Sequence, residues 1–137
     1  MSRREQDSVG GEFYIDDTLL TATGAEINQT CDVSSVSQTL TAAGAVTLNA
    51  RQTTITGPAS TTYAVTLAAP TANEAGLVKV ITMGSTTTTN AVTLALTNVI
   101  GGSAASSASF NAANETLTLV GAGGKWVVLN ETGVTLA

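Results

Sequence analysis

The side chains that most often carry catalysis are few in this 137-residue chain, and they are poorly placed to work together. There is no histidine, so the commonest general acid or base near neutral pH is missing. The single cysteine, Cys31, and the many Ser and Thr hydroxyls have no obvious base to activate them as nucleophiles. Glu74, Glu115 and Glu131 are the acids beyond residue 32, and they are far apart in sequence. The sequence therefore predicts a protein that is not an enzyme.

Two short segments resemble ligand-binding sequences without meeting their requirements. Glu12 with Asp16-Asp17 supplies too few ligands for a dedicated Ca²⁺ loop and is typical of a solvated turn. Residues 121–125, Gly-Ala-Gly-Gly-Lys, lack the full spacing of a phosphate loop and the Ser or Thr after the lysine. We therefore expect neither a metal nor a cofactor. Cys31 has no partner for an intrachain disulfide, and we expect it to be a small packing residue.

Charge is unevenly distributed along the chain. Residues 1–32 contain seven of the ten acids and two of the five basic residues, so they account for the whole net charge of −5. The remaining residues balance Arg51, Lys79 and Lys125 against three glutamates. Charge normally keeps free surfaces soluble and apart, so a neutral body favours burial against copies of itself. The alternative is a Thr-rich surface that is solvated through its hydroxyls.

The same composition argues against two classes of partner. Nucleic acid binding needs clustered Lys or Arg, and this acidic chain has no basic stripe. No apolar run approaches the roughly 18–20 residues that cross a bilayer. The first seven residues lack the apolar region of a secretion signal, so we expect synthesis in a cytoplasm, followed by assembly into a larger particle.

Short strands dominate the pattern after residue 36. The chain contains 25 Thr residues, and Thr, Val and Ile favour strands because Cβ branching suits a pleated surface. A small residue followed by Val-Thr-Leu recurs at 45–48, 64–67, 91–94 and 133–136, with a looser copy at 116–119. In each copy Val and Leu point to one face and Thr to the other. The uneven intervals indicate repeated strand chemistry rather than a fixed-period solenoid.

The turn signals complete the expected fold. Residues 76–83 form a more apolar strand that we expect to be central, and residues 121–124 separate the two arms of a hairpin. Trp126 opens the second arm and is expected to anchor the core, with a binding-site role as the alternative. The fold class predicted is all-β, a compact antiparallel β-sandwich or barrel-like body over residues 36–137.

Residues 1–35 are expected to form an N-terminal arm. Phe13-Tyr14-Ile15, flanked by glycines and acids, suits either a single strand added to another sheet or an edge strand of the body. Thr23 and Glu26 have the spacing of a capping box, which predicts one short helix of one or two turns.

Two stretches resemble structural proteins of tailed bacteriophages. Residues 20–34, LTATGAEINQTCDVS, are similar to a phrase found in head-decoration and head-fibre proteins. Residues 45–137 resemble the body of those proteins, with counterparts at Val65 to Pro70, Gly76 to Thr82, and Gly124-Lys125-Trp126. The resemblance implies a trimeric β-rich knob that is attached to a shell through its N-terminal segment.

We therefore expect a capsid decoration, or cement, protein that acts as a homotrimer on the virion surface. Its partners would be itself and the major capsid protein, which the arm would contact through Arg3, Arg4, Phe13, Tyr14, Ile15, Leu19 and Leu20. The body and part of the trimer contact would be packed by Val65, Leu67, Val78, Val80, Leu94, Leu96 and Trp126. The alternative is a head- or tail-fibre component with a receptor- or glycan-binding tip. That alternative needs an exposed pocket, for which the body offers little beyond Trp126, Tyr63 and Phe110.

Overall fold

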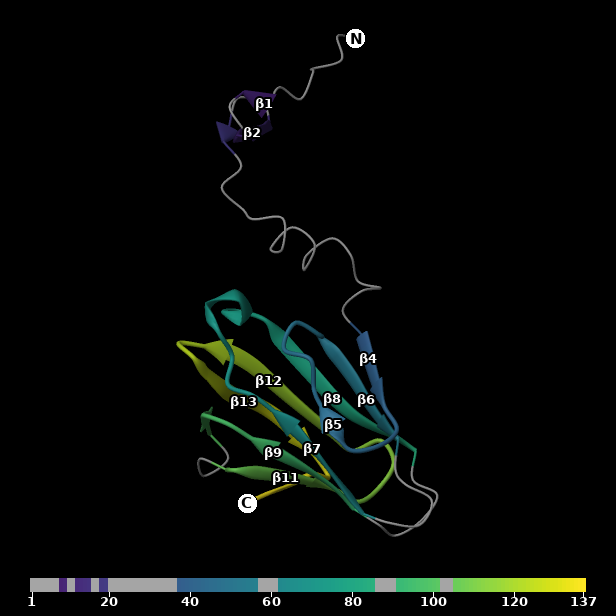
Figure 1. Ribbon diagram of the computed structural model, residues 1–137. Coiled ribbons are helices and arrows are strands. Elements are labelled where there is room, and N and C mark those ends of the chain that lie inside the picture. The colour runs from purple at the N-terminus through teal and green to yellow at the C-terminus, as the bar shows by residue number, and fades with distance from the viewer. Residues whose placement is uncertain are drawn as a thin grey trace. The chain divides into compact units, whose positions relative to one another are not determined.

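The computed structural model describes residues 8–9, 12–15, 18–19, 37–56, 62–85, 91–101 and 105–137. The chain divides into two compact units, Met1–Cys31 and Asp32–Ala137, and each is described by itself (Figure 1).

The N-terminal unit contains a small antiparallel sheet of three strands, β1 (Ser8–Val9), β2 (Glu12–Ile15) and β3 (Thr18–Leu19). Phe13-Tyr14-Ile15 lies in the middle strand, which pairs with β1 on one side and with β3 on the other. The expectation of a lone strand added to another sheet, or of an edge strand of the body, is therefore wrong. Glycine and aspartate pairs separate the three strands, and these residue types favour two-residue hairpin connections. Arg3, Arg4, Leu20 and the predicted helix cap at Thr23 and Glu26 lie outside the described residues.

The body is a sandwich of two β-sheets, which confirms the predicted all-β class (Figure 1). The six-stranded sheet has the order β10-β13-β12-β8-β6-β4. Its strands are β4 (Ser37–Leu40), β6 (Gln52–Thr56), β8 (Val78–Ser85), β10 (Val99–Ile100), β12 (Thr116–Ala122) and β13 (Lys125–Thr132). The five-stranded sheet has the order β14-β11-β9-β7-β5. Its strands are β5 (Gly44–Ala45), β7 (Tyr63–Leu67), β9 (Val92–Leu96), β11 (Ser107–Phe110) and β14 (Thr135–Leu136).

Both sheets are mixed rather than antiparallel throughout. From β4 to β12 each strand lies in the opposite sheet from the strand before it, so the chain winds around the core. Each return to a sheet runs in the same direction, which makes β4, β6 and β8 parallel, and likewise β5, β7 and β9. The direction then reverses, because β11 pairs antiparallel with β9, and β12 with β8. Turn residues mark where strands end but not which sheet comes next, so the sequence pattern missed these windings.

The Val-Thr-Leu phrase builds most of the five-stranded sheet. Its copies supply β7, β9 and β14 and the segment that follows β5, where the Val46 amide donates to the Thr66 carbonyl at 2.8 Å. Register places Val65 opposite Leu94, and Leu67 opposite Leu96, so the apolar side chains meet on one face. The looser copy at 116–119 belongs to β12 in the other sheet.

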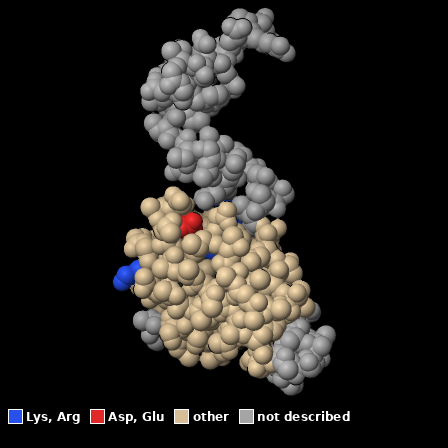
Figure 2. All heavy atoms as spheres, viewed as in Figure 1, with Lys and Arg blue, Asp and Glu red and all other residues tan. Residues whose placement is uncertain are grey.

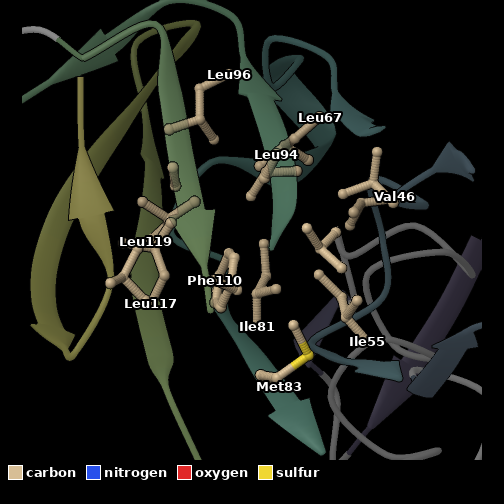
Figure 3. Packing of buried hydrophobic residues seen from close by; sticks show 14 of the residues in the cluster. Val46, Ile55, Leu67, Ile81, Met83, Leu94, Leu96, Phe110, Leu117 and Leu119 are labelled. Atoms are coloured by element: carbon tan, nitrogen blue, oxygen red, sulfur yellow. The ribbon is translucent and has the colours of Figure 1, made fainter. Parts of the chain in front are cut away.

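The core lies between the two sheets and is mostly aliphatic, with Met83, Phe110 and Trp126 as its other large members (Figure 3). Ile81, Leu94 and Phe110 have no exposed surface, and they point toward one another from β8, β9 and β11 (Figure 3). The apolar strand β8 lies between β6 and β12, which confirms its predicted central place. The predicted hairpin is also confirmed: β12 and β13 pair through Ala122 and Lys125. The two residues between them, Gly123 and Gly124, have φ of 57° and 74°, as a type I′ turn requires.

Candidate interaction surface and a buried lysine

Four aliphatic side chains form a continuous row across the outward face of the six-stranded sheet. Val78 of β8 pairs with Val120 of β12, Val120 pairs with Val127 of β13, and Val127 pairs with Ile100 of β10. Directly paired residues point to the same side of a sheet, so the four side chains are neighbours. Val78 and Ile100, at the two ends, are 45% and 47% exposed, whereas the two central valines are half-buried. We call this set the aliphatic row.

The remainder of that face becomes polar in regular steps. The next row pairs Val80 with Thr118 and Gln52, and Thr118 with Asn130. The row beyond it consists entirely of threonines, one from each of five neighbouring strands: Thr39, Thr54, Thr82, Thr116 and Thr132. Lys125 pairs with Ala122 beside the hairpin turn, so its charge lies at the margin of the face. The face therefore runs from aliphatic at one side to hydroxyl-rich at the other.

The outward face of the five-stranded sheet contains only small side chains. One row joins Ala45, Thr66, Ala95 and Ser107, and another joins Ala64, Thr93, Ser109 and Thr135. All eight are exposed or half-buried. Among the residues described, the three large apolar side chains with high exposure are Val78, Ile100 and Leu129, and all three belong to the six-stranded sheet.

The charged residues of the described body are divided between buried and exposed positions. Lys79, Glu74 and Glu115 are buried, whereas Arg51, Lys125 and Glu131 are exposed. The side of the body in view in Figure 2 is correspondingly almost free of charge. The two buried glutamates have structural partners. Glu74 accepts hydrogen bonds from the Thr71 amide at 2.8 Å and hydroxyl at 2.6 Å, and Glu115 accepts from the Asn111 amide at 2.6 Å.

A capping box therefore exists in the body, at Thr71-Ala72-Asn73-Glu74, where it starts the 3-10 turn Ala72–Glu74. The same Thr-x-x-Glu spacing predicted a helix cap at Thr23 and Glu26, but the cap at Thr71 was not predicted. The signal for this second box was present in the sequence. Its carboxylate is used to order a turn, so it is not an available acid.

Lys79 is fully buried, and its ammonium group is held by the turn between β5 and β6. Its Nζ donates to the Thr47 carbonyl at 2.9 Å and also to the Ala50 carbonyl. The same nitrogen lies 5.7 Å from the centroid of the Trp126 ring, within the range of a cation–π contact. Burial lowers the pKa of Lys79 to about 8, and the nearby Glu74 carboxylate opposes that shift. These contacts tie the first winding to the central strand, so the lysine is part of the core.

Trp126 anchors the other side of this cluster. Its side chain has no exposed surface, and its indole Nε1 donates to the Ala68 carbonyl at 2.8 Å. Trp126 therefore lies in the core, as predicted. Phe110 is equally buried, and Tyr63 is half-buried with its hydroxyl donating to the Thr56 carbonyl at 2.6 Å. None of these three aromatic residues lies on an open face where a glycan could stack.

The residues expected to pack the body fall into two groups. Val65, Leu67, Leu94, Leu96 and Trp126 are buried inside one chain, so they have almost no surface left for another copy. Val78 and Val80 lie on the outward face of the six-stranded sheet and keep exposed surface. In the arm, Phe13, Tyr14 and Ile15 belong to β2, and Leu19 belongs to β3.

The buried lysine and most of the aliphatic row were not predicted from the sequence. In β8 the inward positions are 79, 81 and 83, so the alternation alone would have placed Lys79 inside. Residues 126–129, Trp-Val-Val-Leu, are apolar at successive positions, which in a strand makes both faces apolar. Ile100 carried no such signal, because its place in the row depends on the parallel pairing of β10 with β13.

Two further features concern ligands and membranes. Within residues 8–19 and 37–137, as far as the structure describes them, no three His, Cys, Asp or Glu side chains gather as a metal site. The part of the chain that the structure describes also has no helix long and apolar enough to span a bilayer. No protein-family model matches this sequence, and no curated protein matches it.

Proposed function

We propose that the chain is a non-enzymatic structural protein that decorates the outer surface of a phage capsid as a homotrimer. The observation that carries the proposal is the pairing of a nearly uncharged body with a separate, acidic N-terminal unit. The buried ionisable groups of the body are occupied in holding turns, and its exposed apolar surface is concentrated on one sheet. These properties suit a protein that assembles with other copies, and the sequence resemblance to phage decoration proteins favours a capsid as the assembly.

In this proposal the two units have different tasks. The N-terminal unit binds the major capsid protein, and the body associates with other copies. A weak contact from each N-terminal unit would suffice, since three linked copies bind a symmetric shell with much higher avidity than one copy. A ligand that binds only the assembled shell also stabilises that shell.

The test is co-sedimentation with shells that lack this protein. The full chain is compared with a variant that lacks residues 1–31 and so retains the whole second unit. We expect the full chain to pellet with shells and the truncated chain to stay in the supernatant. Circular dichroism of the truncated chain is the control, because a folded body that fails to bind assigns the contact to the N-terminal unit. If neither chain pellets, the decoration proposal is wrong, and attachment to a fibre or tail becomes the better account.

A further inference from the structure

The aliphatic row is the one place in the described body where large apolar side chains gather in solvent. Its members come from four adjacent strands, and two of them expose nearly half of their surface. Leu129, at 54% exposure, follows two residues after Val127 on β13, at the bulge in its pairing with β12. Scattered exposed aliphatic residues are ordinary, but a contiguous group of them marks an interaction site.

We propose that the aliphatic row lies along a threefold axis and is covered there by the same row of two further copies of this chain. The inference rests on the proposed function for its copy number and adds the surface through which the copies meet. The charge of the molecule favours its own kind as the occupant. Lys125 is the one charged side chain paired on this face, and it lies at the hairpin end. An identical face therefore requires little burial of charge, which is the costly step at an interface.

The shape of the row suits three copies better than two. Three sheets arranged as a triangular prism converge on a stripe that runs parallel to the axis, whereas two stacked sheets use their whole faces. Sheets that come within about 6 Å of a threefold axis leave a gap that valine and isoleucine side chains can fill from three sides. The row runs across the strands, so the strands would lie perpendicular to the axis.

The face is small, so the expected association is reversible. Six strands at about 4.8 Å spacing and about 19 Å length give a face of roughly 550 Å². Each chain can bury at most this area on this face, which is below the roughly 800 Å² per partner of a standard interface. The threonine row would then lie toward the outer margin of the prism, where hydroxyl groups remain hydrated.

Sedimentation equilibrium of the full chain tests the proposal. We expect a mass three times the 13.7 kDa of the chain. Val78→Asp and Ile100→Asp, at the two exposed ends of the row, should shift the association midpoint to at least tenfold higher concentration. Thr93→Asp places the same charge on the exposed face of the other sheet and should keep the wild-type mass. A wild-type chain that sediments as one or two copies would overturn the proposal, and so would loss of association in Thr93→Asp alone.

Cysteine crosslinking tests the same contact between chains without placing a charge in the row. Identical residues of the row would face one another across the axis at about 10 Å, beyond the reach of a disulfide but within that of a short linker. Val127→Cys in a Cys31→Ser background should therefore be crosslinked between chains by a short bismaleimide. Thr93→Cys in the same background should remain a single chain. Crosslinking at Thr93 with none at Val127 would contradict the proposal. Shell binding distinguishes this proposal from the proposed function. A trimer that does not bind shells would contradict the decoration proposal but not the trimer surface. A chain that binds shells, but whose Ile100→Asp variant still forms trimers, would contradict only the trimer surface.

Discussion

The two sheets of the body differ in the side chains that they place on their inward and outward faces. In the five-stranded sheet, strict alternation sends Val and Leu inward and Ala, Thr and Ser outward. The six-stranded sheet carries Lys79 and Thr53 on its inward face and the aliphatic row on its outward face. In the first sheet, hydrophobic periodicity alone decides which side chains face inward. The second depends on a few directional contacts inside the chain, and its outer face has the character of an interface.

The difference predicts where substitutions should cost the most stability. Inward positions of the five-stranded sheet are replaceable by other apolar residues of similar volume, since such swaps usually cost under about 1.5 kcal/mol. Inward positions of the six-stranded sheet include hydrogen-bonded groups whose partners lie in turns. Removing one of those groups leaves a buried partner unsatisfied in addition to the lost packing.

The largest effect is expected at Trp126. Trp126→Ala removes the largest buried side chain and its hydrogen bond to the Ala68 carbonyl, and it uncovers the Lys79 ammonium. We expect the free energy of unfolding to fall by about 3–5 kcal/mol. Urea titration followed by circular dichroism measures the change. Leu129→Ala on the same strand is the matched control and should change stability by less than about 0.5 kcal/mol when the chain is a monomer.

Gly121→Ala should be the next most damaging change. A Cβ at Gly121 would collide with the backbone carbonyl of Glu74, and the two segments are joined by hydrogen bonds at this point. We expect a loss of about 1–3 kcal/mol, because backbone must move to admit the methyl group. Gly44→Ala in β5 is the control, since its Cβ would meet only a Leu40 methyl at 3.7 Å. Equal thermal stability of the two variants would refute the close approach at Gly121.

Lys79 should make the free energy of unfolding depend on pH in the alkaline range. The pKa of Lys79 is about 8 in the folded chain and 10.5 when unfolded, so between these values the unfolded chain binds more protons. Stability should therefore rise with pH from about 8, by at most about 1.4 kcal/mol per pH unit. Burial raises the pKa of Tyr63, which has the opposite effect above about pH 10 and limits the useful range to about pH 8–9.5.

Lys79→Met is the variant that tests this assignment. It keeps the aliphatic length of the side chain but cannot titrate, so the rise in stability between pH 8 and 9.5 should disappear. Denaturant midpoints at several pH values provide the comparison. Lys125→Met is the control, because it removes the same charge from an exposed side chain and leaves the buried lysine in place. A rise that persists in Lys79→Met would assign it to another group.

The smallest expected effect is a gain in stability on replacing Thr53. The Thr53 hydroxyl is buried on the inward face of β6, and it has no hydrogen-bond partner. Thr53→Val keeps the shape and removes the unsatisfied group, so we expect a stabilisation of up to about 1 kcal/mol. Thr54→Val, the adjacent half-buried residue in the outward threonine row, is the control and should be neutral within about 0.5 kcal/mol. Destabilisation of Thr53→Val by 1 kcal/mol would show that the hydroxyl is satisfied in solution.

Sequence alone predicted the class of the body and several of its elements. The Val-Thr-Leu phrases identified strands because alternation is a local property, and two glycines in succession identified the hairpin turn. The parallel windings were not predictable, since which strands pair is decided by the return of the chain around the core. For the same reason the aliphatic row was not visible: its residues are separated by up to 49 positions in sequence and meet only through register. Lys79 was overlooked because a lysine inside an apolar strand is usually assigned to solvent.

The winding path also fixes the order in which the body can be completed during synthesis. Gln52 pairs with Val80, and Val99 pairs with Trp126, so each of these contacts waits for a distant part of the chain to emerge. Because β12 lies between β8 and β13, the six-stranded sheet has an open edge at β8 until the C-terminal hairpin arrives. Folds with such distant pairings form slowly, and their unpaired strand edges invite association with the wrong chain. Residues 116–137 therefore complete the sheet, and a chain that has been made only as far as residue 115 would be an aggregation-prone intermediate.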